Sequence, residues 1–130
     1  MSTLRAISPK HVRSLARYSP GVEVPSGARL LFVSGQLGVD ADGQAPEDAQ
    51  AQARLCFSAV GAILAEAGMS FADIVRLNAY VTDRAYLADY MRVRDNHVGY
   101  PPPASTLMIV SGFSRQEFKV EVECVAAKLP

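Results

Sequence analysis

The sequence predicts one α+β domain, in which strands are separated by two helices that pack on one face of a sheet. Its 130 residues are the length of a single domain, and 49% of them are hydrophobic, which is enough for a packed core. Two segments repeat their apolar residues at helical spacing, whereas five segments have the alternation or the short apolar runs of strands. The expected order is β-β-α-β-α-β-β within one domain of residues 1–130, and an apolar second face of the sheet would be covered in a homo-oligomer.

The N-terminal third of the chain is expected to contain two strands. Residues 1–20 have no regular pattern, and residues 22–24 form a short alternating piece that a hairpin turn at residues 25–27 ends. Residues 29–36 then contain an apolar run that is typical of a buried strand. Gly35, near the end of this strand, is either a simple bulge or a point where another chain or a ligand approaches the backbone closely.

A first helix is expected to begin near Pro46 or Glu47 and to end at Gly68, a residue type that commonly follows helices. Its apolar residues recur at steps of three and four, which places them on one face. This face consists of Ala49, Ala53, Cys56, Phe57, Val60, Leu64 and Ala67. The polar residues off this face are Gln50, Gln52, Arg54 and Glu66.

The middle of the chain predicts a strand over residues 73–81 and a second helix over residues 84–98, which follows the helix cap Thr82–Asp83. Alternate residues of the strand, from Val75 to Val81, form its apolar face, and the face that includes Tyr80 is mixed. The inner stripe of the helix would consist of Leu87, Tyr90, Met91, Arg94 and Val98. Three prolines at residues 101–103 end this helix.

The last two strands are expected at residues 104–110 and 118–126. The final strand alternates strictly, so that Phe118, Val120, Val122 and Cys124 share one face. Glu121 and Glu123 lie on the other face, roughly 7 Å apart by the rise of a strand. Two interpretations stay open here: a solvated polar face, or a carboxylate that faces a pocket as a general base or hydrogen-bond acceptor.

Composition excludes several classes of function. The 13 basic and 13 acidic residues give a formal net charge of zero, so the chain has no basic excess with which to bind nucleic acid through its phosphates. No apolar run is long enough for a membrane helix, and the N-terminus lacks the apolar core of a signal peptide. A cytoplasmic protein is therefore expected.

The cysteines and histidines predict no redox or metal centre. Cys56 and Cys124 are far apart in the sequence and have apolar neighbours, so two buried thiols are expected. Together with His11 and His97, their spacing matches no set of zinc ligands. We therefore expect no metal site.

Several motifs together resemble the RidA family, also called YjgF/YER057c/UK114 or endoribonuclease L-PSP, from Tyr18 onward. The motifs are Tyr18-Ser19-Pro20, Phe32-Val33-Ser34-Gly35-Gln36, Glu66-Ala67-Gly68, Asp73-Ile74-Val75, Tyr80-Val81-Thr82-Asp83, Pro103-Ala104 and Val120-Glu121-Val122-Glu123. The resemblance implies a chorismate-mutase-like mixed sheet with two helices on one face, in a homotrimer with pockets between subunits. It also implies hydrolysis of reactive imines and enamines, such as 2-aminoacrylate, to a keto acid and ammonia without a metal or an organic cofactor.

The same resemblance implies roles for five residues. Glu121 would handle the water, and Gly35 would let the ligand approach the backbone. Tyr18, Ser105 and Leu107 would line the substrate pocket. Active imine deaminases of the family have an arginine that clamps the substrate carboxylate where this chain has Ser105. A serine offers one neutral hydrogen bond of about 1 kcal/mol, against about 1.5–3 kcal/mol for a charged one.

Three functional accounts follow from this departure. In the first account, the chain has a different substrate, which is either neutral or anchored by Arg17, Arg76 or another arginine. Alternatively it keeps weak deaminase activity, or it is a non-catalytic trimer that binds a small metabolite. A deaminase or hydrolase is favoured narrowly over pure binding. Ribonuclease activity has little support, because the neutral chain shows no basic stripe interleaved with aromatic residues.

Overall fold

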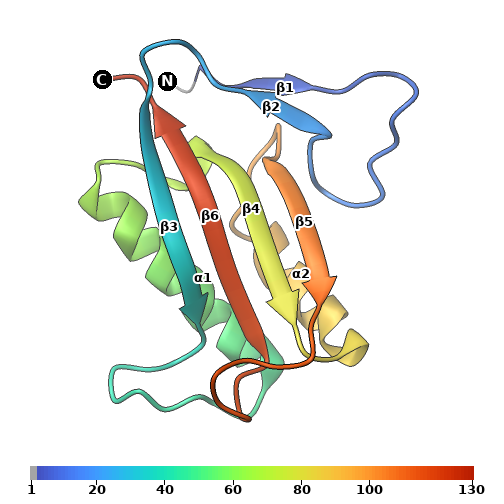
Figure 1. Cartoon of the computed structure of the whole chain (residues 1–130), viewed down its shortest axis with the longest axis vertical. Helices are drawn as coiled ribbons and strands as arrows, with labels where there is room; N and C mark the ends of the chain where they lie inside the picture. Colours follow the sequence, from blue (N-terminus) through green and yellow to red (C-terminus); the bar gives the residue numbers. More distant parts are fainter. Residues whose placement is uncertain (1–2) are drawn as a thin grey trace.

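The computed structural model describes residues 3–130, which form a four-stranded sheet with two helices on one face and a two-stranded ribbon above one end (Figure 1). The sheet and its helices comprise β3 (Arg29–Leu37), α1 (Ala49–Glu66), β4 (Ile74–Val81), α2 (Leu87–Asp95), β5 (Ala104–Ile109) and β6 (Val120–Lys128). The ribbon consists of β1 (Arg5–Ile7) and β2 (Gly21–Glu23), and two short 3₁₀ turns are η1 (Phe71–Asp73) and η2 (Arg84–Tyr86). The predicted α+β class, with two helices on one face, is confirmed.

The sheet is mixed, with strand order β3-β6-β4-β5. The last strand, β6, lies in the middle and runs antiparallel to both β3 and β4. The edge strand β5 runs parallel to β4, and α2 lies in the connection between them. Parallel neighbours need such a crossover, since a tight turn cannot join them.

The core lies between the sheet and the two helices. The valines Val120 and Val122 of β6 are fully buried, as are Leu77, Ala79 and Val81 of β4. From α1, the core receives Ala53, Cys56, Phe57, Val60 and Leu64. The alternation predicted for the final strand is therefore confirmed, although the strand itself begins and ends two residues later than expected.

The N-terminal predictions were partly wrong. Residues 5–7 were expected to be irregular, but they form β1 and pair with β2. The expected hairpin across residues 25–27 is also absent within the described chain, because β2 pairs with β1 and β3 pairs with β6. Local turn chemistry at Pro25–Gly27 was compatible with a hairpin, but the long-range pairing of β3 overrides it.

Helix boundaries moved inward from the predicted ones. Helix α1 begins at Ala49, because the side chain of Asp48 accepts a hydrogen bond from the backbone of Ala51 and caps the helix. Residues 84–86 form a 3₁₀ turn capped by Asp83, and the α-helix after it ends at Asp95, three residues before the predicted end. Its buried face also includes Val93, which the predicted stripe omitted.

Two predictions of burial were wrong. Gln52 was placed off the apolar face of the first helix, but it is fully buried. Its Nε2 donates to the carbonyls of Pro46 and Glu117, and its Oε1 accepts from the backbone nitrogen of Lys119. In β4, a register shift between Ile74 and Arg76 buries Ile74 and leaves Val75 only partly buried.

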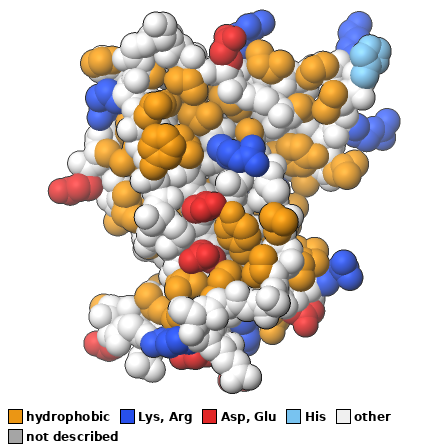
Figure 2. Space-filling view, viewed as in Figure 1, with side chains coloured by type: hydrophobic (Ala, Val, Ile, Leu, Met, Phe, Trp, Pro, Cys, Tyr) orange, Lys and Arg blue, Asp and Glu red, His pale blue; other side chains and the backbone are white. Residues whose placement is uncertain are grey.

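The second face of the sheet, which we call the open face, is exposed over most of its area (Figure 2), although Ala127 near its ribbon end is buried. Large apolar residues are exposed on it: Leu30 (55%), Phe32 (72%) and Met108 (53%). Figure 2 shows apolar side chains around acidic ones on this face. Exposed apolar residues that gather on one face are typical of interaction surfaces.

Within residues 3–130, no helix has the length and apolarity that crossing a membrane requires. The same residues contain no group of three or more histidine, cysteine, aspartate or glutamate side chains that could hold a metal ion.

The three hydrogen bonds of Gln52 predict a strong effect on stability. Gln52→Leu removes them and leaves partly buried backbone groups of Pro46, Glu117 and Lys119 unpaired, so we expect a loss of about 3 kcal/mol in the free energy of unfolding. Urea denaturation at fixed protein concentration measures this loss. The control is Ser58→Ala, an exposed position on the same helix, which should change stability by less than about 0.5 kcal/mol. Equal stabilities of the two variants would contradict this role of Gln52.

Candidate functional site

Glu121 lies on the open face near the start of β6. The alternation of this strand directs Val120 and Val122 into the core and Glu121 to the opposite side. In the sheet, Glu121 pairs with Tyr80 of β4 and with Leu37 of β3. The core therefore fixes the position of the carboxylate from which the proposed chemistry starts.

The β3 backbone comes very close to the Glu121 side chain at Gly35. A Cβ atom added to Gly35 would lie 2.7 Å from both the carboxyl carbon and Oε2 of Glu121. The register of β3 against β6 also shifts between Val33 and Gln36, so that Ser34 and Gly35 together oppose Glu123. Gly35 is thus both a bulge and a point of close approach, and what approaches it within the chain is Glu121.

This environment favours the protonated form of Glu121. Partial burial raises the pKa of the Glu121 carboxyl, and the negative charge of Glu123 on the same face raises this pKa further. A carboxylate with a raised pKa is a stronger base than one in free solution, and this property suits proton transfer.

Glu123 is held by a neighbouring strand. The hydroxyl of Tyr80 donates to Glu123 Oε1 at 2.7 Å. This hydrogen bond is the largest cause that raises the pKa of Tyr80, with smaller contributions from burial and from the charges of Glu123 and Glu121. Glu123 is therefore oriented along the sheet toward β4.

A hollow in the open face adjoins Glu123. It has a volume of about 340 Å³, and its polar lining comes from Ser34, Asn78 and Glu123, with Phe32 and Cys124 among its other walls. The Oδ1 atom of Asn78 is buried without a hydrogen-bond partner among the described residues. We call this hollow the Asn78–Glu123 depression.

Two predicted site residues lie away from Glu121. In the parallel pairing of β4 with β5, Ser105 is opposite Leu77 and Leu107 is opposite Ala79, both of which are fully buried. Leu107 also packs against the core. Ser105 and Leu107 are therefore on the helix-facing side of the edge strand, whereas Glu121 is on the open face.

Tyr18 lies in the loop between β1 and β2, whose residue Ser19 bonds to the proline segment before β5, whereas Glu121 pairs with Tyr80 near the end of β4. Its side chain lines a second hollow of about 650 Å³ together with Arg17, Tyr100 and Pro102. The next residue, Ser19, ties this loop to the proline segment through its hydroxyl, which donates to the carbonyl of Pro102 at 2.6 Å. The loop that contains Tyr18 therefore lies beside the start of β5, the strand to which Ser105 belongs.

Within a single chain, Glu121 therefore contacts Gly35, whereas Tyr18, Ser105 and Leu107 lie in other parts of the structure. Sequence reasoning missed Tyr80 and Asn78 as neighbours of the carboxylates. The sequence feature that could have identified them is the mixed polar and apolar face of the strand at residues 74–81. This face points to Glu121 and Glu123 only when β4 is known to pair with β6.

Neither cysteine is placed for nucleophilic chemistry. Both are free and buried, as predicted. Burial raises the pKa of Cys56 to about 12 and that of Cys124 to about 11. Both thiols are therefore protonated at neutral pH and behave as small apolar side chains.

Comparison with known proteins now bears on this site. The family described as Endoribonuclease L-PSP matches residues 8–128. The RutC family protein YjgH of Escherichia coli is 36% identical over 108 residues, which are 82% of this chain and 80% of YjgH. This chain belongs to the RidA (YjgF/YER057c/UK114) family. The predicted resemblance is thereby confirmed.

Other RidA-family members agree over nearly the full length. A protein of Escherichia coli named "Putative reactive intermediate deaminase TdcF" is 31% identical over 120 residues, or 88% of this chain and 89% of its own. The crystal structure of the Rid family protein YyfB from Yersinia pestis superposes with a TM-score of 0.87 at 27% identity, covering 98% of this chain and 100% of YyfB. RidA from the Antarctic bacterium Psychrobacter has a TM-score of 0.72 at 28% identity, with the same coverage. The RidA-family fold expected from the sequence is therefore confirmed.

The contact between Gly35 and Glu121 predicts the effect of adding one methyl group. Gly35→Ala should push the flexible carboxyl end of Glu121 toward solvent, which removes part of the desolvation and lowers the pKa of Glu121 toward its ordinary value. Carboxyl carbon NMR across a pH titration measures the change. The matched control is Gly112→Ala, where an added Cβ meets nothing within 4 Å. An unchanged pKa of Glu121 in Gly35→Ala would show that the contact does not set its environment.

Proposed function

We propose that this protein hydrolyses reactive imines or enamines to a carbonyl product and ammonia, with Glu121 as the group that activates water. The observation that carries the proposal is the Glu121 carboxylate, which lies over Gly35 at an open face and has a raised pKa. Support also comes from the relative TdcF, whose name describes a reactive intermediate deaminase. This activity needs no metal or organic cofactor.

Hydrolysis of an imine requires few catalytic groups from the protein. Once an imine nitrogen is protonated, its carbon is electrophilic, and water can add to it while Glu121 accepts a proton from that water. Glu121 then passes this proton to the nitrogen of the carbinolamine. As the C–N bond breaks, Glu121 accepts the remaining hydroxyl proton, the carbonyl forms, and the departing ammonia takes up that proton as ammonium. Holding the water and the imine in contact contributes as much as the base itself, since both must be oriented.

The complete pocket would form between copies of the chain in a homotrimer. Support comes from the separation within one chain of Glu121 and Gly35 from Tyr18 and Ser105, and from the exposed apolar residues of the open face, among them Phe32. A cyclic assembly brings different surfaces of neighbouring copies together. Light scattering tests this, and a mass of one 14.0 kDa chain would contradict it.

The substrate is proposed to differ from that of family members that have an arginine at the position of Ser105. A serine hydroxyl cannot neutralise a substrate carboxylate, whereas a guanidinium binds it through two parallel hydrogen bonds. The alternative function, a non-catalytic trimer that binds a small metabolite, is favoured by this same substitution. Imine hydrolysis above the spontaneous rate would distinguish the deaminase from the binding protein.

Glu121→Gln is the direct test of catalysis. The amide keeps the size of the side chain but cannot accept the proton, so we expect the rate of imine hydrolysis above the spontaneous rate to fall by about 100-fold or more. Imines are generated in place by an amino acid oxidase, and keto acid release is followed with semicarbazide as a competing trap. Glu66→Gln, at an exposed position of α1, should retain full activity.

The pH dependence gives an independent control. If Glu121 is the base, the acid limb of kcat/KM lies above the ordinary glutamate pKa of 4.5. Glu123→Gln removes a negative charge that raises the pKa of Glu121, so this limb should move to lower pH. Equal rates for Glu121→Gln and the unchanged protein, or no rate above the spontaneous one, would remove the deaminase proposal and leave the binding alternative.

Ser105→Arg tests the substrate preference. The new guanidinium should increase the affinity for simple 2-oxo acids by about tenfold, since a charge-assisted pair replaces a neutral hydrogen bond. Calorimetry with pyruvate measures the gain, with Ser105→Gln as a neutral control of similar length. No gain for the arginine variant in a correctly assembled protein would show that position 105 does not face the ligand.

A further inference from the structure

We propose that the Asn78–Glu123 depression is a subsite for a positively charged substrate side chain, with Glu123 and Asn78 as its hydrogen-bond acceptors. The inference rests on the proposed function, since it treats the depression as the extension of the site at Glu121. The substrate class that follows is an imine whose side chain ends in a guanidinium or ammonium group.

Glu123 supplies the charge. It is the only charged side chain at neutral pH among the described residues that line the depression. Tyr80 fixes its Oε1 atom with a hydrogen bond of 2.7 Å, and no other donor of residues 3–130 bonds to this carboxylate. The second oxygen is thus available to a ligand. A carboxylate binds a cationic donor roughly twice as strongly as a neutral donor.

Asn78 supplies a second acceptor at the same level of the sheet. It pairs with Glu123 in the register of β4 against β6, so the two side chains start about 5 Å apart on one face. The buried Oδ1 atom of Asn78 has no donor within the described chain, and a rotation of the amide toward the depression that Asn78 lines would bring it to a donor of the ligand. A planar guanidinium carries several N–H groups in a fixed fork and can serve both acceptors.

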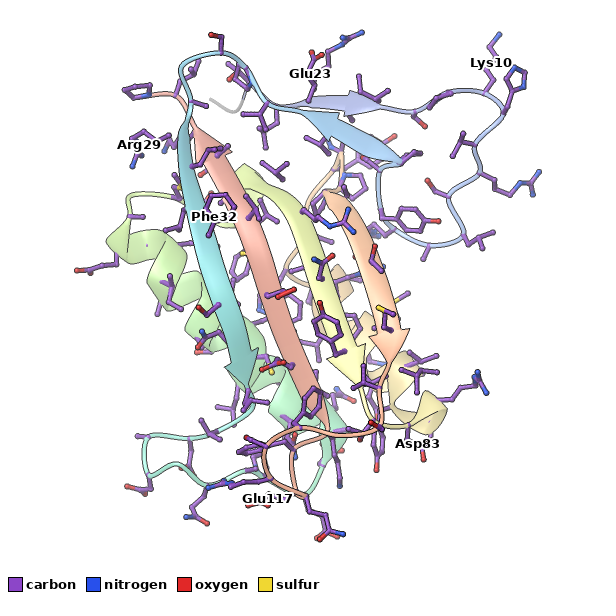
Figure 3. All side chains as sticks on the ribbon, viewed as in Figure 1. Lys10, Glu23, Arg29, Phe32, Asp83 and Glu117 are labelled. Carbon is purple, nitrogen blue, oxygen red and sulfur yellow. The ribbon has the colours of Figure 1, made fainter. Side chains whose placement is uncertain are left out.

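The walls of the depression suit such a group. Phe32, labelled in Figure 3, extends from β3 at this face and lines the depression, so that its ring can border a cation there. The bulge at Ser34 and Gly35 opens the sheet beside Glu123. The volume of about 340 Å³ is sufficient for the side chain of arginine, which extends over seven heavy atoms beyond the reacting carbon.

Arg76 carries a positive charge on the same face, opposite in sign to that of Glu123, and replacing it gives a second test of the subsite. It lies two residues before Asn78 on β4, outside the lining of the depression, and its Nη2 atom donates to Thr106 Oγ1 at 2.7 Å. Thr106 therefore holds this guanidinium toward the edge strand. Its charge still weakens the attraction for a cation, so its removal should strengthen cation binding.

Turnover tests the subsite with a matched pair of substrates. Imines derived from arginine and from citrulline have nearly the same shape and differ in the charge of the end group. We expect kcat/KM to be about tenfold higher for the arginine imine, because a charge-assisted hydrogen bond replaces a neutral one. In Glu123→Gln this ratio should fall to about one, whereas Glu66→Gln should leave it unchanged.

Binding tests the same subsite without turnover. Calorimetry compares N-butylguanidinium with N-butylurea, and we expect the cation to bind about tenfold more tightly. Glu123→Gln and Asn78→Ala should each reduce this preference, and Arg76→Gln should increase it. Circular dichroism and light scattering establish that each variant is folded and assembled as the unchanged protein is.

The outcomes separate the two proposals. A charge preference in binding without imine hydrolysis would contradict the deaminase and support the subsite. Hydrolysis that does not distinguish the arginine imine from the citrulline imine, with equal binding of the two probes, would overturn the subsite and leave the deaminase intact. A charge preference that persists in both Glu123→Gln and Asn78→Ala would also overturn it. The same holds if a neighbouring copy fills the depression, because neither probe would then bind there.

Discussion

The buried amide of Gln52 is the interaction on which the position of the candidate site depends. It joins the start of α1 to the loop before it and to the residues that lead into β6, through hydrogen bonds to Pro46, Glu117 and Lys119. The start of β6 is thereby fixed relative to the helix. A slip of one residue in this strand would turn Val120 and the other core side chains outward and the glutamates inward.

The same strand therefore serves the core and the chemistry. Its inward side chains contribute the apolar burial that stabilises the sheet against α1, and its outward side chains place two carboxylates on one face. Folding constrains these carboxylates to an arrangement that is electrostatically unfavourable, since the negative charge of Glu123 raises the pKa of Glu121. Glu121 thus weakens folding as the pH rises through its pKa, because the folded chain then binds more protons than the unfolded chain. Such local destabilisation is typical of functional sites.

Much of the fold could be predicted from residue patterns. The alternation of β6 and the helical spacing from Ala53 to Leu64 identified the core, because burial acts on each side chain according to its local periodicity. Gln52 was misplaced, since only the loops that pack around it from residues 46 and 117 make an amide fit there. The β1–β2 pairing and the crossing of β6 between β3 and β4 depend on contacts distant in sequence, which no local pattern encodes.

The candidate site shows the same division between local and distant information. Glu121 and Gly35 could be named from the sequence, because family motifs surround both, but their direct contact required the register of β3 against β6. Asn78 could not be found, because its significance lies in a missing donor rather than in its residue type. With a serine at position 105, the side chains assigned to the proposed site and its subsite, Glu121, Glu123 and Asn78, all carry acceptor oxygens. The negative charge of such a site would stabilise the protonated imine beside Glu121. It would also attract a second positive charge, on a substrate side chain in the Asn78–Glu123 depression.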